Sequence, residues 1–146
     1  MECIINMELI NYLFQHSLIS KYQHGFLHKH STCSSLLESV YDWSVALNNK
    51  YTTDIIYVDF QKAFDSVSHQ KLITKLEGYG ICGDLLQWIR AFLSNRTQVV
   101  NISGFMSEIV YITSGVPQGS VLGPTLFLLF INDIEDILFE RLHLCV

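Results

Sequence analysis

The stretch TSGVPQGSVLGPTLFLLFIND, residues 113–133, decides how this chain can fold. Glycine and proline punctuate its first half, at Gly115, Pro117, Gly119, Gly123 and Pro124. Proline is well tolerated in the first turn of a helix, so the apolar residues that follow predict a helix from 125 to about 139. Three glycines within nine residues leave a bare backbone against which a flat ligand can lie. The stretch therefore predicts a ligand-binding loop that leads into an apolar helix.

A second informative segment, DIIYVDFQKAFDSVSH, lies upstream at residues 54–69. Residues 54–60 are apolar and rich in β-forming side chains, so they predict a buried strand with Asp59 at its end. A carboxylate there, beside the Phe60 carbonyl, suits a hard, oxygen-seeking metal ion such as Mg²⁺. The alternative is an aspartate that only caps the following turn. Asp65 is better explained as a turn or helix-capping residue.

The remaining residues alternate helical patterns with one hairpin. Helices are predicted at 2–15, from Ser31 or Thr32 to about 48, from 68 to about 78, and at 83–94. The second of these would bury an apolar face made of Leu36, Leu37, Val40, Trp43 and Leu47. Strands at 97–102 and 108–113 predict a hairpin around residues 103–106. This order of elements predicts an α/β (α+β) fold in a single domain.

Composition restricts the classes of function open to the chain. Hydrophobic residues make up 49% and charged residues 16%, which indicates an unusually buried fold or a piece of a larger one. A net charge of −5 with only nine lysines and arginines argues against an autonomous nucleic-acid binder. The longest apolar run, 126–131, is too short to span a bilayer. Four scattered cysteines are typical of free thiols, so we expect an intracellular protein of the nucleus or cytoplasm, without a membrane partner.

Together, the two segments resemble the palm of a reverse transcriptase, specifically that of LINE-like (non-LTR) retrotransposons. The most specific signal is a run of eleven motif residues in order, SGVPQGSVLGP at 114–124. The resemblance extends from about residue 2 to about residue 139. It implies right-hand polymerase architecture, with residues 1–50 at the edge of the fingers and residues 51–146 in the palm. The hairpin that carries the family's second catalytic aspartates is not recognisable in these 146 residues.

The resemblance implies an RNA-directed DNA polymerase that joins a dNTP to the 3′-OH of a DNA primer on an RNA template. Asp59 would be the catalytic metal ligand, assisted by the Phe60 carbonyl, and the metal would be Mg²⁺ or Mn²⁺. Phe64 would exclude a ribose 2′-OH, and Gln118 would contact the incoming nucleotide. The residues implied in nucleotide binding are Lys29, Phe60, Ala63, Phe64, Pro117, Gln118 and Gly119. Without the resemblance, Phe64 is also consistent with a core position and residues 117–119 with an ordinary turn.

The chain also departs from the family pattern. In the fingers segment QHGFLHKHST, residues 23–32, Leu27 and His30 stand where arginines are usual. Three histidines and a cysteine between 24 and 33 could be a zinc site, but their spacing matches no standard finger. Asp133 and Asp136 lie one helical turn apart, and a solvated helix face explains them better than a cation site.

Two expectations follow for the chain in isolation. Residues 142–146 are apolar, like the strand that leads into the family's aspartate pair, so the chain is expected to stop short of its chemistry. We therefore expect no polymerase activity, no stable metal binding, weak nucleic-acid binding and a tendency to self-associate through an unpaired strand at 55–60. The alternative function is a non-enzymatic retroelement remnant that acts at most as a protein or nucleic-acid interaction module.

Overall fold

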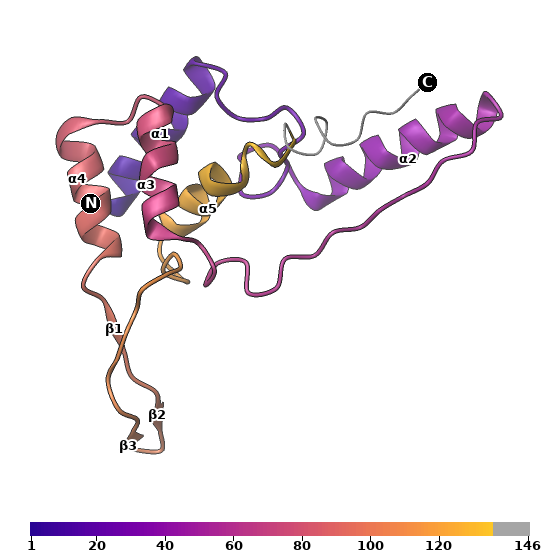
Figure 1. Ribbon diagram of the computed structural model, residues 1–146. Coiled ribbons are helices and arrows are strands. Elements are labelled where there is room, and N and C mark those ends of the chain that lie inside the picture. The colour runs from indigo at the N-terminus through magenta and orange to yellow at the C-terminus, as the bar shows by residue number, and fades with distance from the viewer. Residues whose placement is uncertain (136–146) are drawn as a thin grey trace.

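The computed structural model describes residues 1–135, which form a mixed helical and β structure consistent with the α/β prediction. In chain order the elements are α1 (Glu2–Gln15), α2 (Thr32–Asn48), α3 (His69–Gly78), α4 (Gly83–Leu93), β1 (Thr97–Gln98), β2 (Asn101–Ile102), β3 (Phe105–Met106), β4 (Val110–Tyr111) and α5 (Gly123–Ile131). Helices α1, α3, α4 and α5 gather in one body, from which α2 and the β-hairpin project in different directions (Figure 1). The predicted helices at 2–15, 68–78 and 83–94 are confirmed to within two residues.

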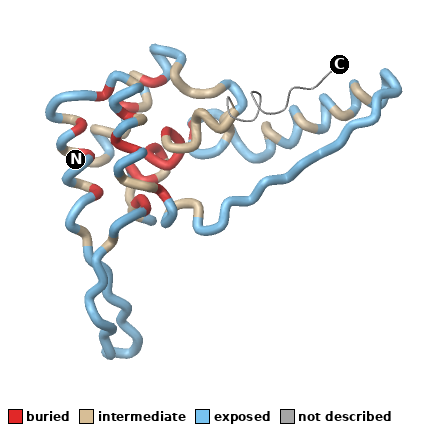
Figure 2. The backbone as a smooth tube through the Cα atoms, in the orientation of Figure 1, coloured by how far each residue is buried: buried red, intermediate tan, exposed pale blue. Residues whose placement is uncertain are grey.

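The hydrophobic core lies between α1, α3, α4 and α5, where the buried residues cluster (Figure 2). Helix α4 contributes Leu86, Ile89 and Leu93, which recur at helical spacing on one face. Helix α5 is apolar on all sides and is buried accordingly, with Leu126, Leu128 and Leu129 fully enclosed. Each such leucine stabilises the fold by roughly 1.5–3 kcal/mol. The apolar helix predicted from the sequence is thus the centre of the core.

Helix α2 begins where the sequence predicts, but its apolar face is not buried. The Ser31 hydroxyl accepts a hydrogen bond from Ser34 N, and the Ser34 hydroxyl accepts one from Ser31 N, which together form a capping box. The helix then projects from the core (Figures 1 and 2), and no residue within it is buried. The side chain of Leu37, for example, is 66% exposed. The predicted burial is therefore wrong, because helical periodicity identifies a face without identifying what covers it.

The strand predicted at 54–60 is absent. Residues 51–60 form neither strand nor helix and run as an extended segment back from α2 to the core (Figure 1). Ile56 and Tyr57 are 79% and 82% exposed. A β-branched sequence favours extended backbone, but a strand also needs a neighbour that accepts and donates its backbone hydrogen bonds. The prediction of a buried strand ending at Asp59 is consequently wrong for this structure.

The predicted hairpin is present, with a tighter turn than expected. Ile102 pairs with Phe105 and Asn101 with Met106, so that only Ser103 and Gly104 form the turn. Both turn residues have positive φ, 51° and 89°, as a type I′ turn requires. Residues 105 and 106, expected in the loop, therefore belong to β3. Closer to the core, β1 and β4 continue the ribbon as a second antiparallel pair.

Helix α5 runs to Ile131, and a turn at Asn132 follows it. The Asn132 side chain donates to the Leu18 carbonyl at 2.7 Å and to the Tyr79 hydroxyl at 3.0 Å, and it accepts from Ser20 N at 3.0 Å. Asn132 thus joins the helix end to the loop after α1. The predicted helix end near 139 and the apolar residues 142–146 lie outside the described residues.

Candidate functional site

The Gly-Pro loop packs directly on the turn formed by residues 61–66, although some fifty residues separate the two in sequence. Gly115 N donates to the Val67 carbonyl at 2.8 Å, and Val116 N donates to the Phe64 carbonyl at 2.9 Å. These two bonds fasten backbone to backbone, so the loop and the turn form one unit. The two motifs thus meet at the turn after Asp59, and no strand takes part in the contact.

Gly115 is the position at which this packing needs glycine. Its φ is +92°, and a Cβ placed there would lie 2.9 Å from Asp65 Cα and 3.0 Å from the Asp65 carbonyl oxygen. The His69 imidazole Nε2 also donates to the Gly115 carbonyl at 2.7 Å. Any side chain at this position would push the loop away from the turn, since real Cβ atoms do not approach backbone so closely.

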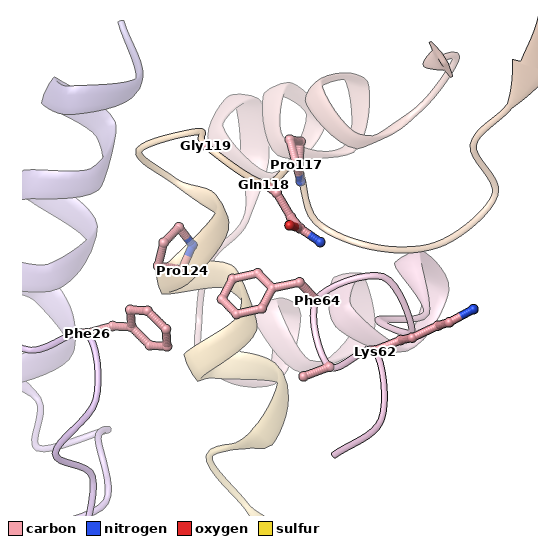
Figure 3. Close-up of a pocket in the computed structure, with 8 residues that line it drawn as sticks. Phe26, Lys62, Phe64, Pro117, Gln118, Gly119 and Pro124 are labelled. Carbon is pink, nitrogen blue, oxygen red and sulfur yellow. The ribbon is translucent and has the colours of Figure 1, made fainter. Parts of the chain in front are cut away.

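An apolar pocket of about 370 Å³ opens between the turn and the loop (Figure 3). Its wall is built around Phe64, whose ring stacks on Phe127 with centroids 4.6 Å apart and planes at 19°. Phe26 makes an edge contact with Phe64, with centroids 5.7 Å apart and planes at 80°. Two prolines, Pro117 and Pro124, also line the pocket. Flat aromatic and proline rings form a cavity that suits a flat ligand with an apolar face.

Gln118 supplies the pocket with a polar group of defined orientation. Its Nε2 donates to Asp65 Oδ1 at 2.9 Å, so the amide nitrogen is engaged at the turn. The amide oxygen and the second amide N–H remain for a ligand, so the side chain can both accept and donate a hydrogen bond (Figure 3). Asp65 occupies the turn, as predicted, but its carboxylate orients Gln118 instead of capping a helix. The site can therefore offer a donor as well as an acceptor to the polar groups of a ligand.

Five of the residues implied in nucleotide binding line this one pocket, namely Ala63, Phe64, Pro117, Gln118 and Gly119. The lining does not include Lys29 or Phe60, which were expected to join them. Phe26 and Lys62 do line it and were not singled out from the sequence. Both lie within segments that the sequence identifies, since Phe26 belongs to the fingers segment and Lys62 precedes Ala63. No periodic pattern marks either side chain as part of a cavity.

The expected metal centre is not assembled by the described residues. Asp59 is exposed on the extended segment 51–60, and residues 1–135 contain no group of three or more His, Cys, Asp or Glu that could hold a metal ion. Two-metal phosphoryl transfer needs several carboxylates that clamp ions about 3.5–4 Å apart. One exposed carboxylate does not fit that requirement, so no chemical step can be assigned to a metal here.

The histidines of the fingers segment and the acidic residues after α5 have other partners. His24 contacts the Ser34 hydroxyl through Nδ1 at 3.0 Å and the Glu38 carboxylate through Nε2 at 3.2 Å. Asp133 pairs with the Lys75 ammonium group, and its side chain remains 42% exposed to solvent. Asp136 lies outside the described residues.

In the part of the chain that the structure covers, no helix has the length and apolar character needed to cross a membrane.

Comparison with known proteins agrees with the resemblance seen in the sequence. The family described as reverse transcriptase (RNA-dependent DNA polymerase) matches residues 3–146. The RNA-directed DNA polymerase from mobile element jockey of Drosophila melanogaster is 39% identical over 116 residues, covering 80% of this chain and 13% of that protein. The probable RNA-directed DNA polymerase from transposon BS of the same species is 29% identical over 139 residues, covering 91% of this chain and 15% of that protein.

A third relative is the Pol polyprotein of the type-1 retrotransposable element R2 of Popillia japonica. It is 30% identical over 92 residues, covering 63% of this chain and 14% of that protein. The chain thus spans a small part of the length of each of these relatives. None of the solved structures matches this chain. The match of the family and of relatives from LINE-like elements confirms the sequence-based assignment.

Proposed function

The chain belongs to the reverse transcriptase (RNA-dependent DNA polymerase) family, and on that premise we propose that it forms the nucleotide-binding part of an RNA-directed DNA polymerase palm. Residues 1–50 would be the edge of the fingers and residues 51–146 part of the palm in a right-hand architecture. One observation carries the proposal: the docked loop and turn enclose an apolar pocket lined by five residues at the family's nucleotide-binding positions.

The pocket would receive the sugar and base of a deoxynucleotide. The Phe64 ring stacks on Phe127 and meets the edge of Phe26, and these two contacts restrict its movement. A fixed ring at this place would exclude a ribose 2′-OH by steric clash, which discriminates without any attractive contact. The Gln118 amide oxygen, oriented by Asp65, would accept a hydrogen bond from a sugar hydroxyl or a base N–H.

Binding of dATP and ATP to the full chain tests this assignment, with ligand-observed NMR as the readout. We expect tighter binding of dATP than of ATP, and we expect Phe64→Ala to abolish the difference by admitting the 2′-OH. Phe105→Ala is the matched control, because Phe105 is 83% exposed in the hairpin and should leave both affinities unchanged. Equal affinities for the two nucleotides in the unmodified chain would contradict the proposal.

We further propose that the 146 residues alone do not extend a primer. Reverse transcriptases generally depend on divalent metal ions, and Asp59 by itself cannot clamp two of them in the required geometry. In a primer-extension assay with an RNA template and Mg²⁺ or Mn²⁺, product should stay at background. Template-dependent incorporation that disappears on Asp59→Ala would overturn this expectation.

A second candidate function is an interaction module without enzymatic activity. The exposed position of Asp59 favours it, because the carboxylate is not part of the pocket lining. The nucleotide experiment separates the two functions: an interaction module would bind neither dATP nor ATP in a manner that depends on Phe64.

A further inference from the structure

A histidine outside the pocket lining holds the loop that carries Gln118. His69 is the first residue of α3, and its imidazole Nε2 lies 2.7 Å from the Gly115 carbonyl oxygen. A carbonyl oxygen only accepts hydrogen bonds, so Nε2 must carry a proton in this contact. The lining of the apolar pocket does not include His69. This side chain therefore has a defined partner in the loop but no part in the nucleotide site as described above.

The contact completes the attachment of the backbone at Gly115. Gly115 N donates to the Val67 carbonyl at 2.8 Å. The next peptide unit is bonded at both ends, because its carbonyl accepts from His69 and its N–H, that of Val116, donates to the Phe64 carbonyl. A peptide unit is planar, so bonds at its two ends fix the orientation of the whole plane. Of these three bonds, only the one from His69 comes from a side chain, and a substitution can remove it.

His69 is itself held by a rigid element. The Ser68 hydroxyl caps α3 by accepting a hydrogen bond from Lys71 N at 3.4 Å. Further along the helix, the side chains of Leu72 and Leu76 are fully buried in the core. A side chain on a packed helix is placed more precisely than one on a loop. The imidazole therefore ties the position of the loop to that of the core.

The peptide that His69 holds lies just before Gln118. Two residues, one of them Pro117, separate Gly115 from Gln118, and the proline ring fixes one of the backbone dihedral angles between them. The bond from the Gln118 amide to Asp65 Oδ1 is exposed, so water competes for both partners. The backbone at Gly115 must therefore bring the amide into place before that bond can orient it.

We propose that His69 is a positioning residue for the nucleotide pocket: it holds the Gly115 carbonyl and thereby keeps Gln118 beside Phe64 (Figure 3). The proposal rests on the nucleotide-binding function proposed above, because Gln118 is the amide that this pocket offers to a ligand. His69 itself does not touch the nucleotide. A histidine that served only the stability of the fold would affect the pocket as a whole, and its effect would not depend on Gln118.

The first test is made without nucleotide, on the ¹⁵N-labelled full chain. The side-chain amide resonances of Gln118 report its bond to Asp65. His69→Leu keeps an apolar bulk and removes the donor, so it should shift these resonances. His69→Gln places an amide N–H near the position of Nε2 and should return them toward those of the unmodified chain. Unshifted Gln118 resonances in His69→Leu would overturn the proposal, whether or not a nucleotide binds.

The matched control is His16→Leu, which makes the same substitution at an exposed position outside the pocket lining. It should leave the Gln118 resonances in place. Circular dichroism checks that each variant is folded. If His69→Leu fails to fold, His69→Asn replaces it, because its shorter amide is polar but falls short of the Gly115 carbonyl. His69→Asn should then shift the Gln118 resonances, and their persistence would overturn the proposal.

The second test is a double-mutant cycle of dATP binding. His69→Leu should weaken binding about three- to tenfold, the effect of one hydrogen bond, while His69→Gln should stay within about twofold of the unmodified chain. In a chain that already carries Gln118→Ala, His69→Leu should cost less than about twofold, because no amide remains to be positioned. Equal losses with and without Gln118 would overturn the proposal, since His69 would then act on the whole pocket.

The two tests separate this proposal from the function on which it rests. If the unmodified chain binds no dATP, the nucleotide-binding function fails, and the Gln118 resonances alone decide whether His69 positions the loop. If dATP binds but the resonances and the cycle show no dependence on His69, the nucleotide-binding function stands and the positioning role is overturned.

Discussion

The substitution Gly115→Ala tests the docking of the loop on the turn, and a second glycine provides its control. Gly115 has φ +92°, and a Cβ there would meet Asp65 Cα at 2.9 Å. Gly104, at the tip of the hairpin, has nearly the same φ of +89°, but a Cβ there would meet nothing within 4 Å. The two alanine variants therefore share the backbone strain and differ only in the steric clash.

The expected losses of unfolding free energy follow from the backbone strain and the steric clash. A left-handed alanine costs about 1–2 kcal/mol, and forcing an extra carbon into a packed site costs about 1–3 kcal/mol. Gly104→Ala should thus lower the free energy of unfolding by about 1–2 kcal/mol at most, and Gly115→Ala by about 2–5 kcal/mol. A loss of that size is a large fraction of the stability of an ordinary domain.

Urea unfolding followed by circular dichroism measures the difference. For a slope near 2 kcal/mol per molar urea, an extra loss of about 2 kcal/mol lowers the midpoint by about 1 M relative to Gly104→Ala. Gly115→Ala should also weaken dATP binding, because the displaced loop carries Gln118 away from Phe64. Equal midpoints for the two variants, with dATP binding intact, would refute the reasoning that the loop is fastened at Gly115.

Three further predictions concern other parts of the fold. Asn132→Ala should lower the free energy of unfolding by about 1–3 kcal/mol, because it leaves backbone groups of the loop after α1 unpaired, and urea unfolding checks it against the exposed Asn11→Ala. Ser31→Ala should reduce the amide exchange protection of the first turn of α2 by about 0.5–2 kcal/mol without changing global stability, which hydrogen exchange resolves. The exposed Ile56 and Tyr57 should drive concentration-dependent self-association, detectable by sedimentation velocity and diminished by the double substitution to threonine; a monomer at every concentration would contradict it.

The sequence predicts local structure well where the signal is local. Ser31 and Ser34 form their capping box, the Ser103-Gly104 turn lies within the predicted hairpin, and α5 begins beside Pro124. Each of these depends on a residue's own backbone preference or on a neighbour within a few positions. The boundaries at which the elements begin were therefore predictable.

What the sequence does not contain is the partner of each apolar surface. Residues 54–60 have the composition of a strand, and Leu37 has the spacing of a core residue, yet both lie exposed. Strand pairing and helix burial are non-local, because they require a second element whose position no short pattern specifies. The exposed position of Asp59 is a consequence, since its expected placement depended on that strand.

The pocket shows the same difference between what local patterns predict and what depends on distant contacts. The family motifs identify Phe64 and Gln118. The structure brings them together through backbone hydrogen bonds that no sequence pattern predicts. Phe26 and Lys62 enter the lining only because the chain folds past them.

The central claim is that the loop and the turn together form a deoxynucleotide pocket, and a titration of ¹⁵N-labelled chain with dATP tests it most directly. The account predicts that the amide resonances of Ala63, Phe64, Gln118 and Gly119 shift together with one dissociation constant, while those of the hairpin tip at Gly104 stay in place. Shifts confined to residues outside the pocket, or no saturable shift of the four amides, would contradict it.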